Sequence, residues 1–218
     1  MLFKNGVYVT TVDNGKEEVT GFNQESKVDK DGNETFTGGQ SFSFNDLDLD
    51  REALVSGDMT LNFISSDDVD GMIDRSGVNN QDAVSRWGYA ATESDNGDVR
   101  GDGNMDFVKY DEISYGLNII NGVGYNAKDA GNYMWGYAMG KMGFHSCVAR
   151  GAAHFYAWLN GKASNGIVSH SNLPIIRWFE NRSWGGDSVA DQRAIQNGLN
   201  DSGSYWKNEN AVRGRLFK

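Results

Sequence analysis

The chain is poor in several features that many proteins depend on. Its 218 residues include one cysteine, Cys147, and one proline, so no internal disulfide framework is possible. Because proline is almost absent, its turns must be made by its 28 glycines, with Asn and Asp. No apolar run approaches membrane-spanning length, and the first ten residues lack the apolar segment of a signal peptide. We expect a soluble chain whose export signal, if it is exported, lies elsewhere.

Positive charge is also scarce. The formal net charge is −10, and the most basic segment is the short Arg213-Gly-Arg215 step near the end. Proteins that wrap nucleic acid normally carry a basic face, so the charge disfavours that class, although an acidic protein can still have a locally basic site. Aromatic residues make up 12% of the chain, enough to bury a core and to argue against disorder.

Strand patterns dominate the first 64 residues. Residues 7–12 and 41–44 have strand-like composition or alternation, and residues 59–64 predict another strand. Asp13-Asn14-Gly15 is typical of a hairpin turn. Residues 29–34 (DKDGNE) predict a second turn rather than a calcium loop, because the sixth position holds Glu34 instead of glycine.

Helical patterns dominate the remainder. Residues 65–74 and 80–92 predict helices, and most of the chain from residue 126 onward is helical in pattern, ending in a helix at residues 188–199. Short strands are expected at residues 105–108 and 117–120. The sequence therefore predicts an α+β fold, in which a β-rich lead module at residues 1–64 precedes a mainly α-helical domain at residues 65–218.

Two carboxylates near the predicted helix of residues 80–92 are candidates for acid–base chemistry. Glu93 ends that helix, and a glycine-rich polar loop leads from it to Asp106. Lysozyme-like glycosidases place a glutamic acid at a helix end, facing a second carboxylate across a cleft. The alternative is that Glu93 is a solvated residue of the last helical turn.

Residues 129–144 (DAGNYMWGYAMGKMGF) combine one carboxylate and one amide with aromatic and small residues. Asn132 is the predicted N-cap of a helix that starts at Tyr133, with Asp129 just outside it. Either both residues only cap a loop, or Asp129 points into a cleft lined by Tyr133 and Trp135. The glycines of this stretch indicate close helix packing and not phosphate binding.

Further candidates lie on the two helices that follow. His154 shares a predicted helix face with Arg150, as a core histidine or as a catalytic group. Asp187 is the predicted N-cap of the last helix, and Asp191 lies one turn later. Cys147, with His170 as base, is a weaker nucleophile candidate. No histidine pair or cysteine cluster with zinc spacing occurs, and no metal or other cofactor is predicted.

Four segments in this order resemble the bacterial toxin 44 domain of polymorphic toxins. They are ATES…GNMDF (residues 91–107), residues 129–144, RGAAHFY (150–156) and GGDSVADQRAIQNG (185–198). The chain departs from the family pattern at Asp187-Ser188-Val189, where the family has an acidic-proline step, and in carrying His154. The resemblance implies a C-terminal toxin of a large secreted protein, often of RHS type, that is paired with a cognate immunity protein.

Three functions follow as hypotheses. The first is an antibacterial effector that hydrolyses peptidoglycan in the periplasm of the target cell, with Glu93, Asp106, Asp129 and His154 as catalytic candidates. Its substrate-binding candidates are Asn132, Tyr133, Trp135, Arg150, Asp187 and Asp191. The second is a cytoplasmic nuclease that uses His154 with Arg150 and Lys109, or a divalent metal on Asp129, Asp187 and Asp191. The third is a non-enzymatic, membrane-active or binding toxin without stable membrane insertion.

Overall fold

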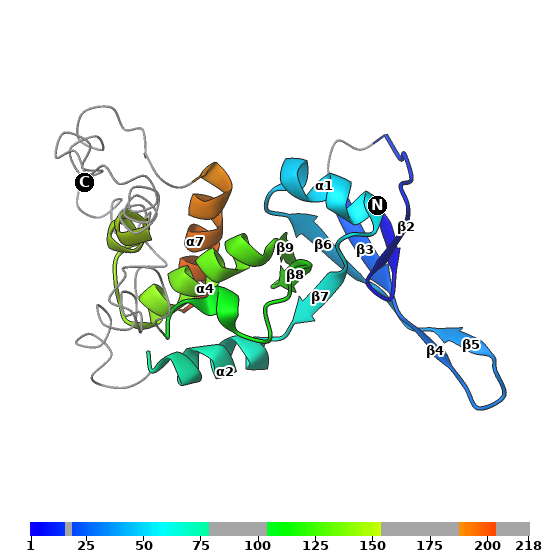
Figure 1. Cartoon of the computed structure of the whole chain (residues 1–218), viewed down its shortest axis with the longest axis horizontal. Helices are drawn as coiled ribbons and strands as arrows, with labels where there is room; N and C mark the ends of the chain where they lie inside the picture. Colours follow the sequence, from blue (N-terminus) through cyan, green and yellow to red (C-terminus); the bar gives the residue numbers. More distant parts are fainter. Residues whose placement is uncertain (16–18, 79–103, 154–187, 204–218) are drawn as a thin grey trace, which may run out of the picture. The chain divides into compact units, whose positions relative to one another are not determined.

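The chain has the α+β fold that the sequence predicts, with most of its strands within the first 64 residues (Figure 1). The computed structural model describes residues 1–15, 19–78, 104–153 and 188–203. Contacts divide the chain into two units. The β unit comprises residues 1–69 and 108–130, and the helical unit comprises residues 70–107 and 131–218. The predicted division after residue 64 stays a prediction.

The β unit contains a seven-stranded mixed sheet and a separate hairpin. Across the sheet, the strands are β2 (Val7–Thr10), β1 (Leu2–Lys4), β3 (Thr20–Gln24), β6 (Gln40–Phe44), β9 (Val123–Tyr125), β8 (Leu117–Ile120) and β7 (Leu61–Ile64). Three neighbouring pairs are parallel, namely β1–β3, β6–β9 and β7–β8. Helix α1 (Leu47–Ser56) connects β6 to β7.

The sheet curls around an apolar core. The backbone N–H of Leu61, at the start of β7, donates to the carbonyl oxygen of Gly6 in the β1–β2 turn at 2.9 Å. This bond links the two edges of the sheet. Inside the curl lies a cluster of buried side chains from β1, β6, α1 and β8: Phe3, Phe42, Leu54, Leu117 and Ile119.

The first hairpin turn is not where the sequence indicated. Asn5 and Gly6 connect β1 to β2 with φ angles of 50° and 82°, the left-handed conformation that a two-residue hairpin turn requires. Strand β1 lies between β2 and β3, so the hairpin predicted at Asp13-Asn14-Gly15 is wrong. The two-residue turn Asn5-Gly6 joins β1 and β2 as a hairpin, so β2 does not form a hairpin with β3.

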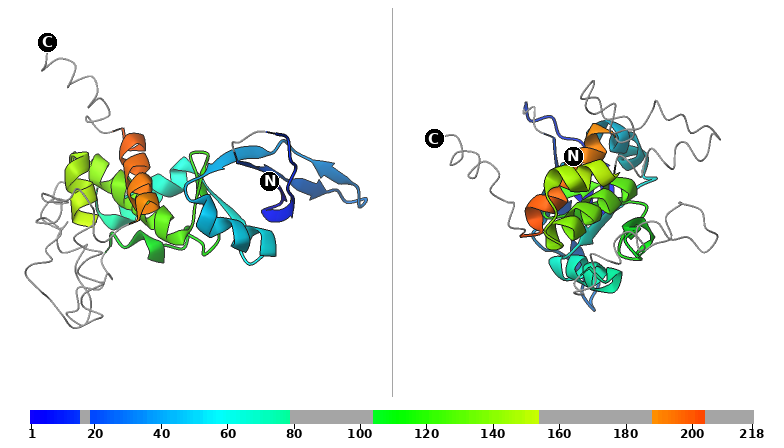
Figure 2. Two further views of the ribbon diagram at one scale, coloured as in Figure 1. Left: turned by 90° about the horizontal axis from the view of Figure 1, so that it is seen from above. Right: turned by 90° about the vertical axis from the view of Figure 1, so that its left-hand side faces the viewer.

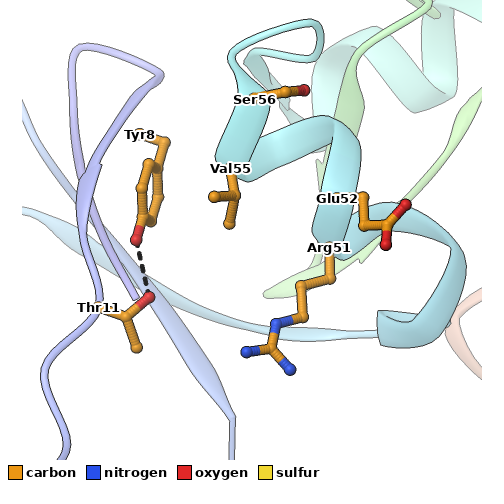
Figure 3. A pocket seen from close by; sticks show the side chains of 6 residues that line it. All are labelled: Tyr8, Thr11, Arg51, Glu52, Val55 and Ser56. Atoms are coloured by element: carbon orange, nitrogen blue, oxygen red, sulfur yellow. Dashed lines mark hydrogen bonds between the residues drawn. The ribbon is translucent and has the colours of Figure 1, made fainter.

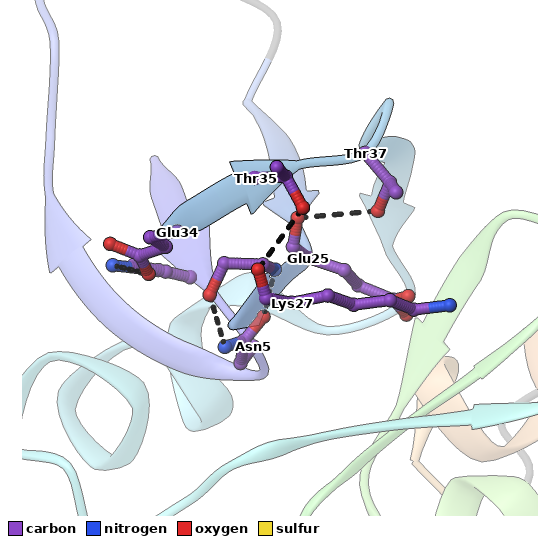
Figure 4. A network of polar contacts seen from close by, with 8 residues as sticks. Asn5, Glu25, Lys27, Glu34, Thr35 and Thr37 are labelled. Atoms are coloured by element: carbon purple, nitrogen blue, oxygen red, sulfur yellow. Dashed lines mark hydrogen bonds and ion pairs between the residues drawn. The ribbon is translucent and has the colours of Figure 1, made fainter. Parts of the chain in front are cut away.

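The turn predicted at residues 29–34 is confirmed. It joins β4 (Ser26–Val28) to β5 (Glu34–Phe36), and the Asp29 carboxylate accepts hydrogen bonds from the backbone N–H groups of Asp31 and Asn33 at 2.8 and 2.9 Å. The hydrogen bonds from Asn33 hold the pKa of Asp29 below its usual value. At the base of this hairpin, the side-chain nitrogen and the side-chain oxygen of Asn5 both form hydrogen bonds with Ser26 (Figure 4).

Two further predictions concern the segments between these elements. Helix α2 (Ser66–Ser76) confirms the helix predicted at residues 65–74, and Ser65 and Asp68 bond reciprocally at its start. The strand predicted at residues 105–108 is wrong, because Phe107–Lys109 form a 3-10 helix. Met105 and Phe107 are both buried, and over so few residues this spacing does not distinguish a strand from a tight turn.

In the helical unit, glycines allow α4 (Ala127–Lys141) and α7 (Val189–Asp201) to approach closely (Figure 2). A Cβ atom on Gly198 would lie 1.9 Å from the carbonyl oxygen of Tyr133, and one on Gly136 would lie 2.0 Å from that of Ile195. The sequence-based assignment of Gly136 to helix packing is therefore confirmed. Within the described residues, no helix is both long and apolar enough to cross a bilayer.

We expect Gly198→Ala to lower the free energy of unfolding by about 2–3 kcal/mol, because the added methyl group meets rigid backbone and the helices must separate. Gly151→Ala is the matched control, since a Cβ on this helical glycine meets no atom of the described residues within 4 Å. That change should be neutral or stabilise by about 0.5 kcal/mol through helix propensity. Urea unfolding of both variants measures the difference, and equal effects would contradict the packing interpretation.

Candidate functional site

The predicted site residues fall into three groups. Glu93, His154 and Asp187 lie outside the described residues, as does His170. Asp129 belongs to the β unit. The others belong to the helical unit: Asp106, Asn132, Tyr133, Trp135, Arg150 and Asp191. Their catalytic and binding roles stay predictions, but the surroundings of the described ones indicate what each side chain is free to do.

Asp129 lies in the first turn of α4, and not outside the helix as predicted. The helix begins at Ala127, and the side-chain oxygen of Asn126 accepts a hydrogen bond from the backbone N–H of Asp129 at 3.0 Å. Asn126 therefore has the capping role that the sequence analysis assigned to Asn132, and that assignment is wrong. The chain leaves β9 at Tyr125 and turns directly into the helix, so the first available amide makes the cap.

Around Asp129 lies a buried polar cluster formed by Asn45, Asp50, Asn126 and Asp129. The Asn45 amide nitrogen donates to Oδ2 of Asp129 at 2.8 Å. The Asn126 amide nitrogen lies between the two carboxylates, 3.4 Å from Oδ2 of Asp129 and 3.3 Å from Oδ1 of Asp50. Asp50 and Asp129 are only 2% and 3% exposed. Neither carboxylate reaches the surface, so neither is placed to contact a polymeric substrate.

Sequence reasoning missed Asp50. Asp46, Asp48 and Asp50 alternate along the start of α1, and nothing in the pattern distinguishes the third from the other two. In the structure, burial raises the pKa of the Asp50 carboxyl to about 6, against the opposing effect of the hydrogen bond from Asn126. The negative charge of Asp46 raises it further.

Asp106 is in a different environment. Its side chain is half-buried beside the 3-10 helix of residues 107–109. Burial raises the pKa of this carboxyl above its usual value, because the charged form is poorly solvated. Asp106 thus combines partial access to solvent with a preference for the protonated form. These are the two properties that a general acid needs.

Asn132 and Asp191 connect the two packed helices. The Asn132 amide donates to Oδ1 of Asp191 at 2.7 Å. Asp191 also closes a capping box with Ser188, which is the N-cap of α7. The predicted N-cap at Asp187 is therefore wrong, because Ser188 supplies the cap.

The aromatic and basic candidates also make contacts within the helical unit. Tyr133 is fully buried, and its hydroxyl donates to Oδ2 of Asp201 at 3.0 Å. The Trp135 ring nitrogen donates to the carbonyl oxygen of Ala149 at 3.0 Å, and Nε of Arg150 donates to Gln192 at 2.7 Å. These bonds give Tyr133, Trp135 and Arg150 structural roles. In particular, Tyr133 has no exposed surface to form a cleft wall.

The exposed Cys147 has a histidine neighbour other than the predicted one. Nδ1 of His145 lies 3.0 Å from Sγ of Cys147 and accepts the backbone N–H of Cys147 at 3.2 Å. In the part of the chain that the structure describes, no group of three or more His, Cys, Asp or Glu side chains is arranged to hold a metal ion.

A surface groove in the β unit lies between β2 and α1 (Figure 3). Its volume of about 670 Å³ is within the usual range for sites that bind small molecules. The Tyr8 ring faces Val55 across the groove, and Arg51 extends toward Thr11. Glu52 and Ser56 complete the lining. The Tyr8 hydroxyl and the Thr11 hydroxyl are hydrogen-bonded at 2.9 Å. An aromatic ring is therefore bordered by hydrogen-bond donors and acceptors.

We expect a double-mutant cycle of Asn132→Ala and Asp191→Ala to give a coupling energy of about 1 kcal/mol or more, because the hydrogen bond involves a charged acceptor and is partly buried. Chemical denaturation of the wild type, both single variants and the double variant measures this energy. Lys141 lies further along α4, near its end, so a cycle of Asn132→Ala with Lys141→Ala should be additive. No coupling in the first cycle would contradict a structural role for the pair.

Comparison with known proteins gives no relative from which a function could be transferred. No protein-family profile matches the chain, and neither a curated protein nor a solved structure is significantly similar to it. The resemblance to the toxin 44 domain therefore stays a prediction, and the chemistry has to be argued from the residues themselves.

Proposed function

We propose that the chain is an antibacterial effector domain that hydrolyses a glycosidic bond of peptidoglycan, with Asp106 as the general acid. The observation that carries the proposal is the environment of Asp106. Among the catalytic candidates in the described residues, this carboxyl is half-buried with a raised pKa, whereas Asp129 is 3% exposed. Asp106 is thus the described candidate that can both hold a proton and reach a substrate.

The proposed chemistry needs two carboxyl groups. Asp106 donates its proton to the glycosidic oxygen as the bond from that oxygen to the anomeric carbon breaks. The second carboxylate, for which Glu93 is the candidate, either activates a water molecule or attacks the anomeric carbon. Water supplies the hydroxyl group of the new reducing end, and its remaining proton returns the acid to its starting state. The proposal requires no metal ion or other cofactor.

The groove beside Tyr8 supports a polysaccharide as the substrate class. A sugar ring has apolar faces and hydroxyl groups around its edge. The groove offers an aromatic ring together with a guanidinium group and the hydroxyl groups of Tyr8 and Thr11 (Figure 3). Among the described lining residues, Arg51 is the one cation, which is little positive charge for binding a polyanion. The net charge of −10 disfavours a nucleic-acid substrate in the same way.

In this proposal, the domain is delivered into a competing bacterium, acts in its periplasm and is neutralised in the producing cell by a cognate immunity protein. Expression directed to the periplasm of a test bacterium should then lyse the cells, whereas cytoplasmic expression should not. Toxicity from the cytoplasm together with degraded RNA or DNA would instead support the nuclease alternative, which relies on His154. Leakage from lipid vesicles without hydrolysis would support the membrane-active alternative.

We expect Asp106→Asn to reduce the release of soluble fragments from purified peptidoglycan by at least about a hundredfold, because an amide cannot donate the catalytic proton. In the wild type, the rate should fall as the pH rises through the raised pKa of Asp106, since the acid form is the active one. The variant removes a poorly solvated charge, so its thermal stability should be unchanged or higher, which separates lost chemistry from lost folding.

Asp111→Asn is the control, because it removes an exposed carboxylate five residues further along the sequence and should retain wild-type release. Glu93→Gln tests the second carboxyl group in the same assay. Full activity of a folded Asp106→Asn protein would overturn the assignment of the acid. An absence of fragment release by the wild type across the range from weakly acidic to weakly basic pH would overturn the proposed reaction.

We expect Arg51→Ala to weaken binding to insoluble peptidoglycan about fivefold, because it removes a charge-assisted hydrogen bond worth about 1 kcal/mol. Arg51 forms no hydrogen bond or ion pair with any residue in the described ranges, so the fold should be unaffected. Co-sedimentation measures the effect, with Lys30→Ala, an exposed cation on the β4–β5 turn, as the control. Equal binding by both variants would exclude the groove as a substrate contact.

A further inference from the structure

The buried cluster of Asn45, Asp50, Asn126 and Asp129 has no evident part in the proposed hydrolysis. It connects two parts of the β unit that are far apart in sequence. Asn45 and Asp50 belong to the segment from the end of β6 into α1, whereas Asn126 and Asp129 belong to the junction between β9 and α4. Its side-chain hydrogen bonds span 76 and 84 residues. Whatever changes the cluster therefore changes how α1 is held.

The cluster contains more negative charge than its donors satisfy. Oδ2 of Asp50 is fully buried and accepts no hydrogen bond, and Oδ1 accepts only the 3.3 Å bond from Asn126. Among the described charged groups, Asp46 at the N-cap of α1 acts on Asp50 through its negative charge, and Asp129 on α4 shares the Asn126 amide with it. Arg51, the next residue, extends into the groove instead. In the described part of the chain no cation pairs with Asp50, so its ionised form would be costly.

Asp129 is better suited to carry the negative charge. It accepts a 2.8 Å hydrogen bond from Asn45 and a longer one from Asn126, and it lies in the first turn of α4, where the helix dipole favours an anion. When two neighbouring carboxyl groups share one site, the proton resides on the group with the poorer hydrogen bonding. The proton of the pair therefore resides on Asp50.

We propose that the Asp50 carboxyl group is a proton-operated latch. When it is protonated, it holds α1 against the β9–α4 junction, and when it loses its proton at neutral pH, it weakens that contact. The amide nitrogen of Asn126 lies between the two carboxylates, and a proton on Asp50 neutralises one of them. The device gives the β unit a stability that depends on the acidity of the compartment.

The direction of the pH dependence follows from linkage. The pKa of Asp50 is about 6 in the folded chain, against a usual value of 3.8. Between these values the folded state keeps a proton that the unfolded chain releases, so stability through this group falls as the pH rises. It is fully present below about pH 4 and is lost above about pH 6. A difference of about two pH units corresponds to a factor of about a hundred in the folding equilibrium constant.

The test compares the wild type with Asp50→Asn, which resembles the protonated carboxyl group and cannot ionise. Urea unfolding at about pH 3.5 should give similar folding constants, and at about pH 7.5 the variant should be more stable by up to about a hundredfold. Hydrogen exchange of α1, corrected for intrinsic rates, should rise with pH in the wild type but not in the variant. Asp111→Asn, which removes an exposed carboxylate of the same unit, should keep the wild-type pH dependence.

A second variant keeps the proposal testable if Asp50→Asn fails to fold. The side chain of Asp46 makes no cap hydrogen bond, so Asp46→Asn should fold, and by removing a repelling charge it should move the transition to lower pH. An unchanged transition in this variant would contradict the latch. So would a stability difference between the wild type and Asp50→Asn that stays constant with pH. The latch would also be overturned if millimolar calcium or magnesium gave the wild type at neutral pH the stability that it has at low pH. That result would show that a cation, and not a proton, neutralises the pair.

Discussion

The start of α4 is the constraint on which the other features depend. Asn126 caps the helix through Asp129, and this fixes which face of α4 carries each later residue. One turn beyond Asp129, Tyr133 falls in the fully buried part of the helix, and Gly136 and Gly140 fall where α7 approaches. If the helix began at Tyr133, as its sequence indicates, Asp129 would lie in a loop and could act in a cleft. Its burial follows directly from the earlier start.

Local signals predict much of the fold because they act over a few residues. The helix that begins after Ser65, the Asp29 turn and the strand of residues 117–120 all appear as expected. Where two signals of the same kind compete, the sequence does not rank them. Asn5-Gly6 formed the hairpin instead of Asp13-Asn14-Gly15, Asn126 formed the cap instead of Asn132, and Ser188 formed it instead of Asp187. In each case both candidates satisfy the same local rule, and the sequence does not show at which of them the strand pair or helix begins.

The candidate site was harder to predict for a related reason. A carboxylate, an amide and an aromatic ring have the same appearance in sequence whether they line a cleft or connect two helices. Asn132 and Asp191 are 59 residues apart and bond at 2.7 Å, and Tyr133 bonds to Asp201. Their tertiary contacts turn binding candidates into structural ones. Asp50 carries no distinguishing sequence signal, since only the packing of α1 separates it from Asp46.

Asp50 and Asp106 show that one physical cause can support two different roles. Burial raises the pKa of both carboxyl groups, so both hold a proton more readily than an exposed aspartate does. Asp50 is 2% exposed and bonds to Asn126, the cap residue of α4, so its proton can only affect the stability of the β unit. Asp106 retains partial access to solvent, which its proposed role as a general acid requires. A raised pKa therefore identifies a group that holds its proton closer to neutral pH, and exposure determines whether that proton serves catalysis or stability.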